Sequence, residues 1–218
     1  MLKADLHIHT EYSLDCDTPI EKIVERCQEL GINCIVVADH GTVEGAVQMK
    51  KFAPFQIIVA EEILTTQGEI MGMFLKDTIP GGLTPQETIK RIRAQDGLVN
   101  IPHPFEGIRG SSLKDWVIEE IVDEIDLIEV FNSRSPFQAN TEKAKAFAEK
   151  HGITGGAGSD AHTLYEIGSA YVEMPEFNGK DEFLKSLAKG TIYGKKSTPL
   201  VRILSTWARV KTQFKKRG

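Results

Sequence analysis

Residues 19–40, PIEKIVERCQELGINCIVVADH, hold the pattern that decides the fold. The first half has the features of a helix over Pro19–Leu30, with a proline in its first turn and Gly31 directly after its last residue. The second half, Cys34–Ala38, is a short apolar run rich in β-branched residues and predicts a strand. A helix that leads into such a strand is part of a βα repeat, which is typical of a mainly parallel sheet.

The same alternation continues in both directions along the chain. Strands are predicted at Lys3–His7, Cys34–Ala38, Gln56–Ala60, Leu98–Ile101, Leu127–Phe131 and Thr154–Ala157. Helices are predicted at Pro19–Leu30, Val43–Lys51, Pro85–Gln95, Leu113–Val122, Gln138–His151 and Asp181–Lys189. Residues 63–75 depart from this rhythm, because 65–69 (TTQGE) has the composition of a turn, so we expect a hairpin inserted after the third strand.

The composition indicates an ordinary globular protein with one domain. The chain has 218 residues, of which 41% are hydrophobic and 26% charged, and its net charge of −5 argues against a surface coated for nucleic acid. Its three cysteines lack CxxC spacing, so we expect neither disulfides nor a thiolate site. Without an apolar run of about 20 residues or a signal peptide, we expect a cytoplasmic protein with no membrane contact.

Histidines mark the ends of the predicted strands. In a parallel α/β barrel these ends meet on one face, where active sites are built. His151 is different, because it ends a helix just before Gly152, where a cation interacts favourably with the helix dipole. The other five lie at or just past the C-terminal end of a strand: His7, His9, His40, His103 and His162.

The first two histidines belong to residues 5–10, DLHIHT. Because side chains alternate along a strand, Asp5, His7 and His9 are predicted to share one face, while Leu6 and Ile8 pack on the other. The two imidazoles can then reach the same ion, and Asp5 is placed to orient one of them.

Acids and histidines follow the other strands in a similar way. Asp39 and His40 end an apolar strand, where a charged pair needs a partner or an ion. Mixed ligation by imidazoles and carboxylates favours Zn²⁺, Mn²⁺ or Fe²⁺ over Mg²⁺. The remaining strand-end groups are Glu61 with Glu62, His103 between two prolines, and Asp160 with His162.

The glycine-rich stretch 155–162 could instead be a phosphate-binding loop. It lacks the GKS or GKT ending of a nucleotide-binding loop, so we set this alternative aside.

The order of these motifs resembles that of the PHP (polymerase and histidinol phosphatase) superfamily. The motifs that carry the resemblance are DLHIHT at 5–10 with a following Asp15, ADH at 38–40, a glutamate after the third strand, IPHP at 101–104 and GSDAH at 158–162. Residues 168–175 (GSAYVEMP) and 190–193 (GTIY) are also similar to the small stand-alone, PHP-associated proteins.

This resemblance implies an α/β fold, namely a distorted (βα)7 TIM-like barrel with two or three divalent ions at the C-terminal face of the strands. It favours Glu62 over Glu61 as the inward acid, and Glu62 would bridge to a third ion held by His103. Many relatives have a further histidine at that third site, where Glu69 and Asn132 are the candidate oxygen ligands here. The implied ligands of the first ion are His7, His9, Glu62 and Asp160, and those of the second are Asp15, His40 and His162.

The resemblance also implies phosphoesterase activity. The predicted reaction is hydrolysis of a small phosphate monoester, of the sugar phosphate, histidinol phosphate or nucleotide class, by metal-activated water, with catalytic roles for Glu62, Asp160 and His162. Arg109 and Arg134 lie in strand-end loops and are the candidate clamps for phosphate oxygens. The alternatives are a nuclease or phosphodiesterase that acts on nucleic acid ends or short oligonucleotides, and a non-catalytic metal-binding regulatory module.

The C-terminus differs from the rest of the chain in charge. We expect the barrel domain to span residues 1–200 and residues 201–218 to form a tail or helix that is not a separate domain. Six Lys and Arg residues and no acid follow Leu200. This basic segment is interpreted as a solvated terminal helix, although it could also supply contacts to a nucleic acid backbone.

Overall fold

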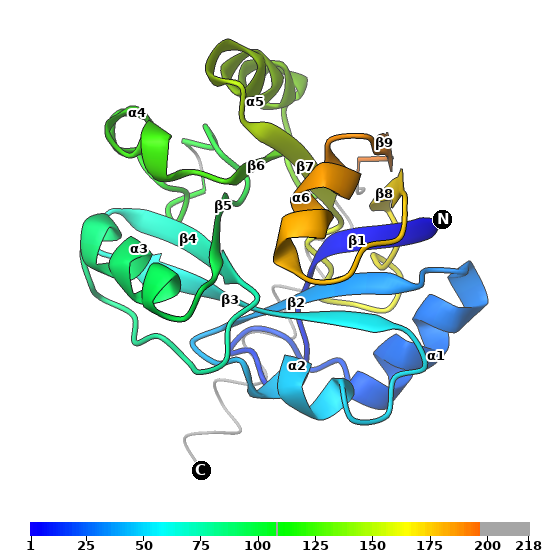
Figure 1. Cartoon of the computed structure of the whole chain (residues 1–218). Coiled ribbons are helices and arrows are strands. Elements are labelled where there is room, and N and C mark those ends of the chain that lie inside the picture. The colour runs from blue at the N-terminus through cyan, green and yellow to red at the C-terminus, as the bar shows by residue number, and fades with distance from the viewer. Residues whose placement is uncertain (108, 197–218) are drawn as a thin grey trace.

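The computed structural model describes residues 1–107 and 109–196, so the predicted tail at 201–218 and the end of the predicted barrel domain lie outside the described residues. Strands and helices alternate along most of the chain, as predicted, except that β4 follows β3 and β8 follows β7 without a helix between them (Figure 1). The strands are β1 (Leu2–Ile8), β2 (Cys34–His40), β3 (Gln56–Thr65), β4 (Gly68–Met73), β5 (Leu98–Ile101), β6 (Leu127–Asn132), β7 (Thr154–Gly158), β8 (Ala170–Met174) and β9 (Thr191–Gly194). The helices are α1 (Ile20–Leu30), α2 (Glu44–Met49), α3 (Pro85–Ala94), α4 (Asp115–Glu120), the 3-10 turn η1 (Val122–Glu124), α5 (Gln138–His151) and α6 (Lys180–Leu187).

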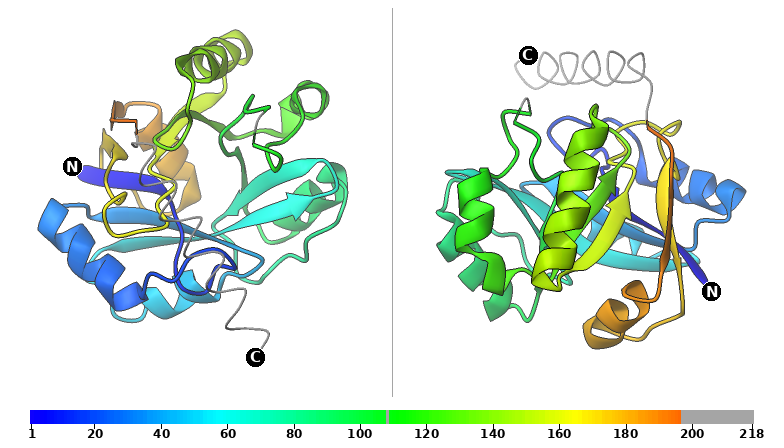
Figure 2. Two further views of the ribbon diagram at one scale, coloured as in Figure 1. Left: turned by 180° about the vertical axis from the view of Figure 1, so that it is seen from behind. Right: turned by 90° about the horizontal axis from the view of Figure 1, so that it is seen from above.

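In the part of the chain that the structure describes, the strands form a nine-stranded sheet in the order β7-β6-β5-β4-β3-β2-β1-β8-β9, which curls into a nearly closed barrel (Figure 2). Parallel pairing joins β1 to β2, β2 to β3, β5 to β6 and β6 to β7. The segment after β7 returns to the end of β1, because the Asp160 N–H donates to the His7 carbonyl at 2.8 Å and the His9 N–H donates to the Ala161 carbonyl at 3.0 Å. The predicted TIM-like barrel is therefore confirmed, and the segment after β7 closes it against the C-terminal end of β1.

The hairpin is present, but it is part of the barrel wall. Strand β3 continues to Thr65 and pairs antiparallel with β4, and β4 in turn pairs antiparallel with β5. The prediction of an insertion after the third strand is wrong in this respect, because β4 takes a place in the barrel between two parallel strands. The sequence analysis also missed β8 and β9, an antiparallel pair that extends the sheet beyond β1.

Two layers of apolar side chains hold the barrel together. The outer layer lies between the strands and the covering helices, and Ile35 and Val37 of β2 belong to it. The inner layer includes the alternate residues Val36 and Ala38, together with Phe183 of α6, which lies across one end of the barrel in Figure 1. Because α6 follows β8 near the start of β1, it covers the N-terminal ends of the strands and leaves the C-terminal ends for polar residues.

The helices are short and amphipathic. Among residues 1–107 and 109–196, helix α5 is the longest, with 14 residues, and no helix there has both the length and the apolar composition to cross a membrane. The two predicted glycine ends are confirmed, because Gly31 and Gly152 follow α1 and α5 with φ of 67° and 66°, in the left-handed conformation that glycine adopts without strain.

Replacing Thr84 with Ala is expected to lower the free energy of unfolding by about 1 kcal/mol. The Thr84 hydroxyl accepts a hydrogen bond from the Glu87 N–H at 3.2 Å and so caps the N-terminus of α3. Urea denaturation of both proteins measures the effect. Lys90→Ala, on the exposed face of the same helix, is the matched control and should change stability by less than about 0.5 kcal/mol. Equal effects of the two substitutions would contradict the capping role.

Candidate metal centre

Imidazoles and carboxylates from the C-terminal ends of the strands gather in three overlapping groups. Within each group the candidate ligand atoms lie within 4.8 Å of one another, and all of the residues except Asp15 and His40 are buried. The groups share members, because His9 belongs to two of them and Glu62 to two. They are His9, Asp15, His40 and His162; His7, His9 and Glu62; and Glu62, Glu69 and His103. The fold thus creates three adjoining places where divalent ions could be held.

The first place lies between β1 and β3. His7 Nε2 and His9 Nε2 lie 3.2 and 3.3 Å from the same oxygen of Glu62. Asp160 Oδ1 is 3.5 Å from His9 Nε2 and 3.9 Å from His7 Nε2, so the fourth predicted ligand borders this group. Glu61 points away from the site and accepts a hydrogen bond from the Ile79 N–H at 2.7 Å, which leaves Glu62 as the inward acid.

The second place lies between the loop after β1 and the ends of β2 and β7. Asp15 Oδ2 is 3.2 Å from His162 Nε2 and 3.5 Å from His40 Nε2. The sequence analysis assigned His9 only to the first ion, but its ring also lies 4.2 Å from the ring of His162, centroid to centroid. His9 is therefore available to either position.

The third place lies between β3, β4 and the loop after β5. His103 Nε2 is 2.6 Å from Glu62 Oε1 and 3.6 Å from Glu69 Oε2. Of the two candidate oxygen ligands, Glu69 belongs to this group. Asn132 lies in the loop after β6, where its Oδ1 accepts a hydrogen bond from the Arg134 N–H at 2.8 Å and its amide donates to Glu129. Its role as a ligand stays a prediction.

The electrostatics of the cluster favour cations. Burial acts to lower the pKa of His40, but Glu62 and Asp15 outweigh it and raise that pKa to about 10. Burial acts to raise the pKa of Glu62, but the neighbouring imidazoles, His7 first, hold it well below its usual range. The carboxylates that keep protons on these imidazoles also attract divalent ions, and ion binding would displace the protons. The donor set and its charge therefore fit metal ions.

The imidazole of His162 differs from that of His40. Burial lowers its pKa, the charge of His9 lowers it further, and the result is a pKa of about 4 despite the nearby Asp15. The ring is therefore neutral near pH 7, the form in which imidazole binds a metal.

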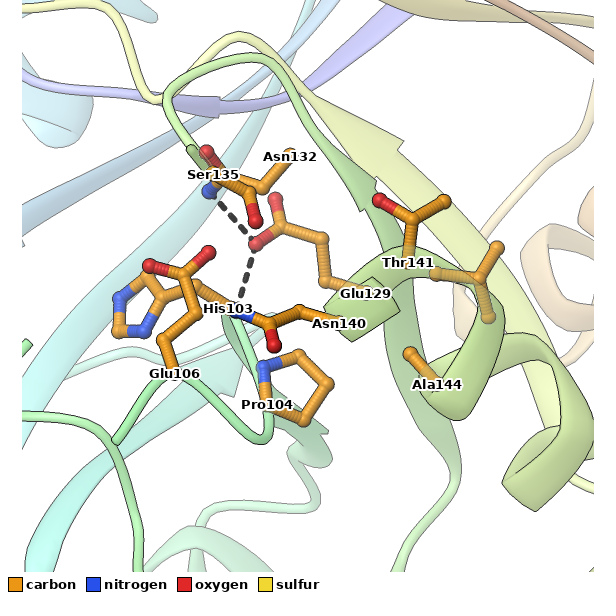
Figure 3. A pocket seen from close by; sticks show the side chains of 10 residues that line it. His103, Pro104, Glu106, Glu129, Asn132, Ser135, Asn140, Thr141 and Ala144 are labelled. Carbon is orange, nitrogen blue, oxygen red and sulfur yellow. Dashed lines mark hydrogen bonds between the residues drawn. The ribbon is translucent and has the colours of Figure 1, made fainter. Parts of the chain in front are cut away.

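Glu129 supports the ligands and was missed by the sequence analysis. Its Oε1 lies 3.3 Å from Nδ1 of His7, and its Oε2 accepts hydrogen bonds from the His103 N–H and the Asn132 amide. Figure 3 shows the last two bonds as dashed lines. The sequence contained one indication of its role. Glu129 is an acid within the apolar run Leu127–Phe131, and an acid is costly to bury without partners.

Asp5 does not orient an imidazole, contrary to the prediction. Its carboxylate accepts backbone hydrogen bonds from Ser159 at 2.9 Å and Gly168 at 3.0 Å, and so anchors the segment after β7. The register of β1 against β2 shifts between Asp5 and Ile8, which breaks the simple alternation that the prediction assumed. As a result, Leu6 packs in the inner layer and Ile8 in the outer one.

The two predicted clamps lie beside the cluster. Arg109 Nη2 donates to Asp160 Oδ2 at 2.8 Å, and its side chain is 24% exposed. Arg134 Nη1 lies 2.6 Å from His162 Nδ1, and Arg134 Nε lies 3.3 Å from Glu166 Oε1. Burial acts to raise the pKa of Asp160, but Arg109 and His7 hold that pKa well below its usual range. Asp160 is therefore ionised and ties one arginine to the ligand cluster.

Comparison with known proteins agrees with a barrel that carries such a cluster. Residues 5–65 match the model of the PHP domain, and residues 138–192 match the model of the PHP-associated region. The uncharacterized protein MJ1587 of Methanocaldococcus jannaschii is 38% identical over 145 residues, which are 61% of this chain and 82% of that protein. MJ0417 of the same organism, also uncharacterized, is 35% identical over 180 residues, or 81% and 72% of the two chains. This chain belongs to the PHP family.

A solved structure shows the same fold. It is a two-domain protein from Bacteroides vulgatus that contains a predicted PHP-like metal-dependent phosphoesterase. The TM-score is 0.72 at 16% sequence identity, and the match covers 89% of this chain and 65% of that one. At this identity the likeness concerns the fold, and this chain spans slightly less than two thirds of the two-domain protein.

Proposed function

We propose that this protein is a metal-dependent phosphoesterase that hydrolyses a small phosphate monoester, of the sugar phosphate, histidinol phosphate or nucleotide class. The observation that carries the proposal is the set of three ligand groups joined through Glu62 and His9. A shared carboxylate and a shared imidazole would hold two or three ions close together, as two-metal phosphoester hydrolysis requires.

The proposed ligands are those that the three groups contain, with Asp160 added at the first place. Their mixture of nitrogen and oxygen atoms suits Zn²⁺, Mn²⁺ or Fe²⁺. When bound, such ions lower the pKa of water and neutralise the charge on phosphoryl oxygens.

The protein's own groups would position the ester. Arg109 and Arg134 are partly buried beside the cluster, where their planar guanidinium groups can bind phosphoryl oxygens. Glu129 fixes the His7 ring and the His103 backbone, so two ligands keep their orientation while substrate enters.

The test is a panel of phosphate esters assayed with metal-stripped protein and with Mn²⁺, Zn²⁺, Fe²⁺ and Mg²⁺ supplied separately. The panel contains sugar, polyol, nucleotide and aryl phosphates, a diester and a short oligonucleotide. We expect metal-dependent release of phosphate from monoesters, and its loss in His9→Ala and Asp160→Ala. Cleavage of the oligonucleotide alone would replace the proposal by the nuclease alternative. Stoichiometric metal binding without turnover of any ester would replace it by the regulatory module.

Replacing Arg134 with Ala is expected to raise KM for a phosphomonoester about tenfold or more, because a charge-assisted hydrogen bond contributes ~1.5–3 kcal/mol. Steady-state kinetics with saturating metal measures the change, and the melting temperature of the variant reports on its folding. Arg91→Ala, which removes an arginine from the outer face of α3, is the matched control and should leave KM as it is. An unaltered KM in Arg134→Ala would remove this residue from substrate binding.

A further inference from the structure

A small pocket with a mixed polar and apolar lining adjoins the third ligand place. It lies between the loop after β5 and the first turn of α5, and Figure 3 shows the side chains around it. Its empty volume is about 180 Å³, which includes the open mouth. Because this volume counts open solvent at the mouth, the enclosed space admits one small group and neither a base nor an aryl ring. The polar residues around it are His103, Glu106, Glu129, Asn132, Ser135, Asn140 and Thr141.

Two buried polar atoms in this lining have no hydrogen-bond partner. They are Oε1 of Glu106 and Oγ of Ser135, and each side chain belongs to a residue that is only 4% exposed. A buried acceptor without a partner costs about 1–3 kcal/mol, so a ligand that supplies the partner recovers that free energy. Neither residue was singled out from the sequence, and neither contributes to the three ligand groups.

The charge around the pocket selects the kind of group it would take. Glu106 Oε2 already lies 3.4 Å from Arg109 Nε, so the carboxylate is paired with a cation. Lys196 Nζ, a second cation, donates to the Thr141 hydroxyl at 3.0 Å on the other side of the pocket. Because Glu129 also lines the pocket, these two cations balance two carboxylates, and no excess charge favours an amine or an acid. A neutral hydroxyl fits, because it can donate to Glu106 Oε1 and exchange a hydrogen bond with Ser135.

The position of the pocket relates it to the ester. His103 belongs both to the pocket lining and to the third ligand group, where its Nε2 is 2.6 Å from Glu62. A phosphoryl group held at the ligand cluster would therefore place the first atoms of its alcohol beside the pocket.

We propose that this pocket, through Glu106 and Ser135, binds a hydroxyl group of the substrate's alcohol, so that the preferred ester is a polyol or sugar phosphate. The inference rests on the proposed function and narrows its substrate class. It also gives Glu106 a role in specificity that is separate from the metal ligands.

The experiment compares glycerol 1-phosphate with propyl phosphate, which has the same carbon chain and no hydroxyl. Calorimetric binding to the metal-loaded protein and the rate of phosphate release are both measured. Wild type is expected to favour glycerol 1-phosphate about tenfold in Kd and in kcat/KM. Glu106→Met, which keeps the length of the side chain, should reduce that preference to about twofold or less, and Ser135→Ala should reduce it in part. Glu142→Gln, on the exposed side of α5, is the control and should keep it.

The outcomes separate this inference from the proposed function. Equal binding of the two esters to wild type, or an undiminished preference in Glu106→Met with an unchanged melting temperature, would overturn the pocket assignment. Hydrolysis of propyl phosphate would in either case uphold the phosphoesterase. If neither ester is hydrolysed but glycerol 1-phosphate still binds more tightly in a Glu106-dependent manner, the pocket stands and the proposed function does not. If Glu106→Met unfolds, Ser135→Ala decides by the same comparison, because its hydroxyl makes no hydrogen bond that folding would lose.

Discussion

Glu62→Gln should reduce the turnover of a phosphate monoester on the order of 10³-fold, because the several kcal/mol of charge stabilisation that bound ions supply depends on this carboxylate. One oxygen of Glu62 faces the His7 and His9 rings, and the other lies 2.6 Å from His103, so it is the one acid shared by the first and third ligand places. A neutral amide would bind a cation weakly at both. Elemental analysis of the dialysed variant should show less bound metal than in wild type. Steady-state kinetics of both proteins with added metal measures the loss of turnover.

Glu61→Gln is the matched control for this result. Glu61 is the adjacent residue in β3, but its side chain points away from the cluster and accepts a hydrogen bond from Ile79. Burial raises the pKa of Glu61 to about 7, so an uncharged amide resembles the form that is already half populated near neutral pH. Activity and metal content should stay within about threefold of wild type. A similar loss of activity and metal in Glu61→Gln and Glu62→Gln would mean that the substitutions disturb β3 and that the effect does not come from the loss of a metal ligand.

Replacing Gly158 with Ala is expected to destabilise the protein by about 3 kcal/mol and to lower its metal content. A Cβ atom at this position would lie 2.4 Å from the His7 Cβ and 2.8 Å from the His7 backbone nitrogen. It would also approach Glu129 Oε1 at 2.9 Å. Neither strand can move aside easily, because hydrogen bonds join the segment after β7 to the His7 carbonyl. The added methyl group must therefore displace the imidazole of His7 from the ligand cluster.

Urea denaturation and metal analysis test this prediction, with Gly156→Ala as the control in the same strand. There the nearest atom to a new Cβ is a methyl carbon of Leu6 at 3.2 Å, which is the movable end of a side chain. We expect a loss of about 1 kcal/mol or less and no change in metal content. Wild-type stability and metal content in Gly158→Ala would show that the contact between β7 and His7 is looser than the structure indicates.

The predicted helices and strands correspond closely to those in the structure where the local pattern was strong. Helix α5 begins and ends at the predicted residues, and β5 spans the predicted range. The prediction was incomplete at β4. A turn followed by a strand predicts a hairpin, but it does not indicate that the second strand of the hairpin pairs with β5 as well as with β3. The pattern failed at β9, whose residues are mostly exposed and carry little hydrophobic alternation.

The histidine ligands could be anticipated because they lie at strand ends, which parallel strands bring together, whereas Asp15, Glu62 and Glu69 were expected from the family resemblance. His7, His40, His103 and His162 converge for this reason although up to 155 residues separate them in the chain. The supporting groups could not be anticipated in the same way. Glu129 lies 122 residues from the ring that it contacts, and no local pattern relates the two positions.

The amino-acid sequence by itself determined the order of the βα units and which histidines and acids stand at the strand ends, because both depend on periodicities within a few residues. Only the tertiary structure decided how these groups are shared among the ligand places and that Asp5 faces the backbone. It also decided that Glu106 and Ser135 line a pocket beside His103. Those outcomes depend on a register shift in β1 and on contacts between loops that are far apart in the chain. Such contacts form only when the barrel closes, and the order of residues does not encode them locally.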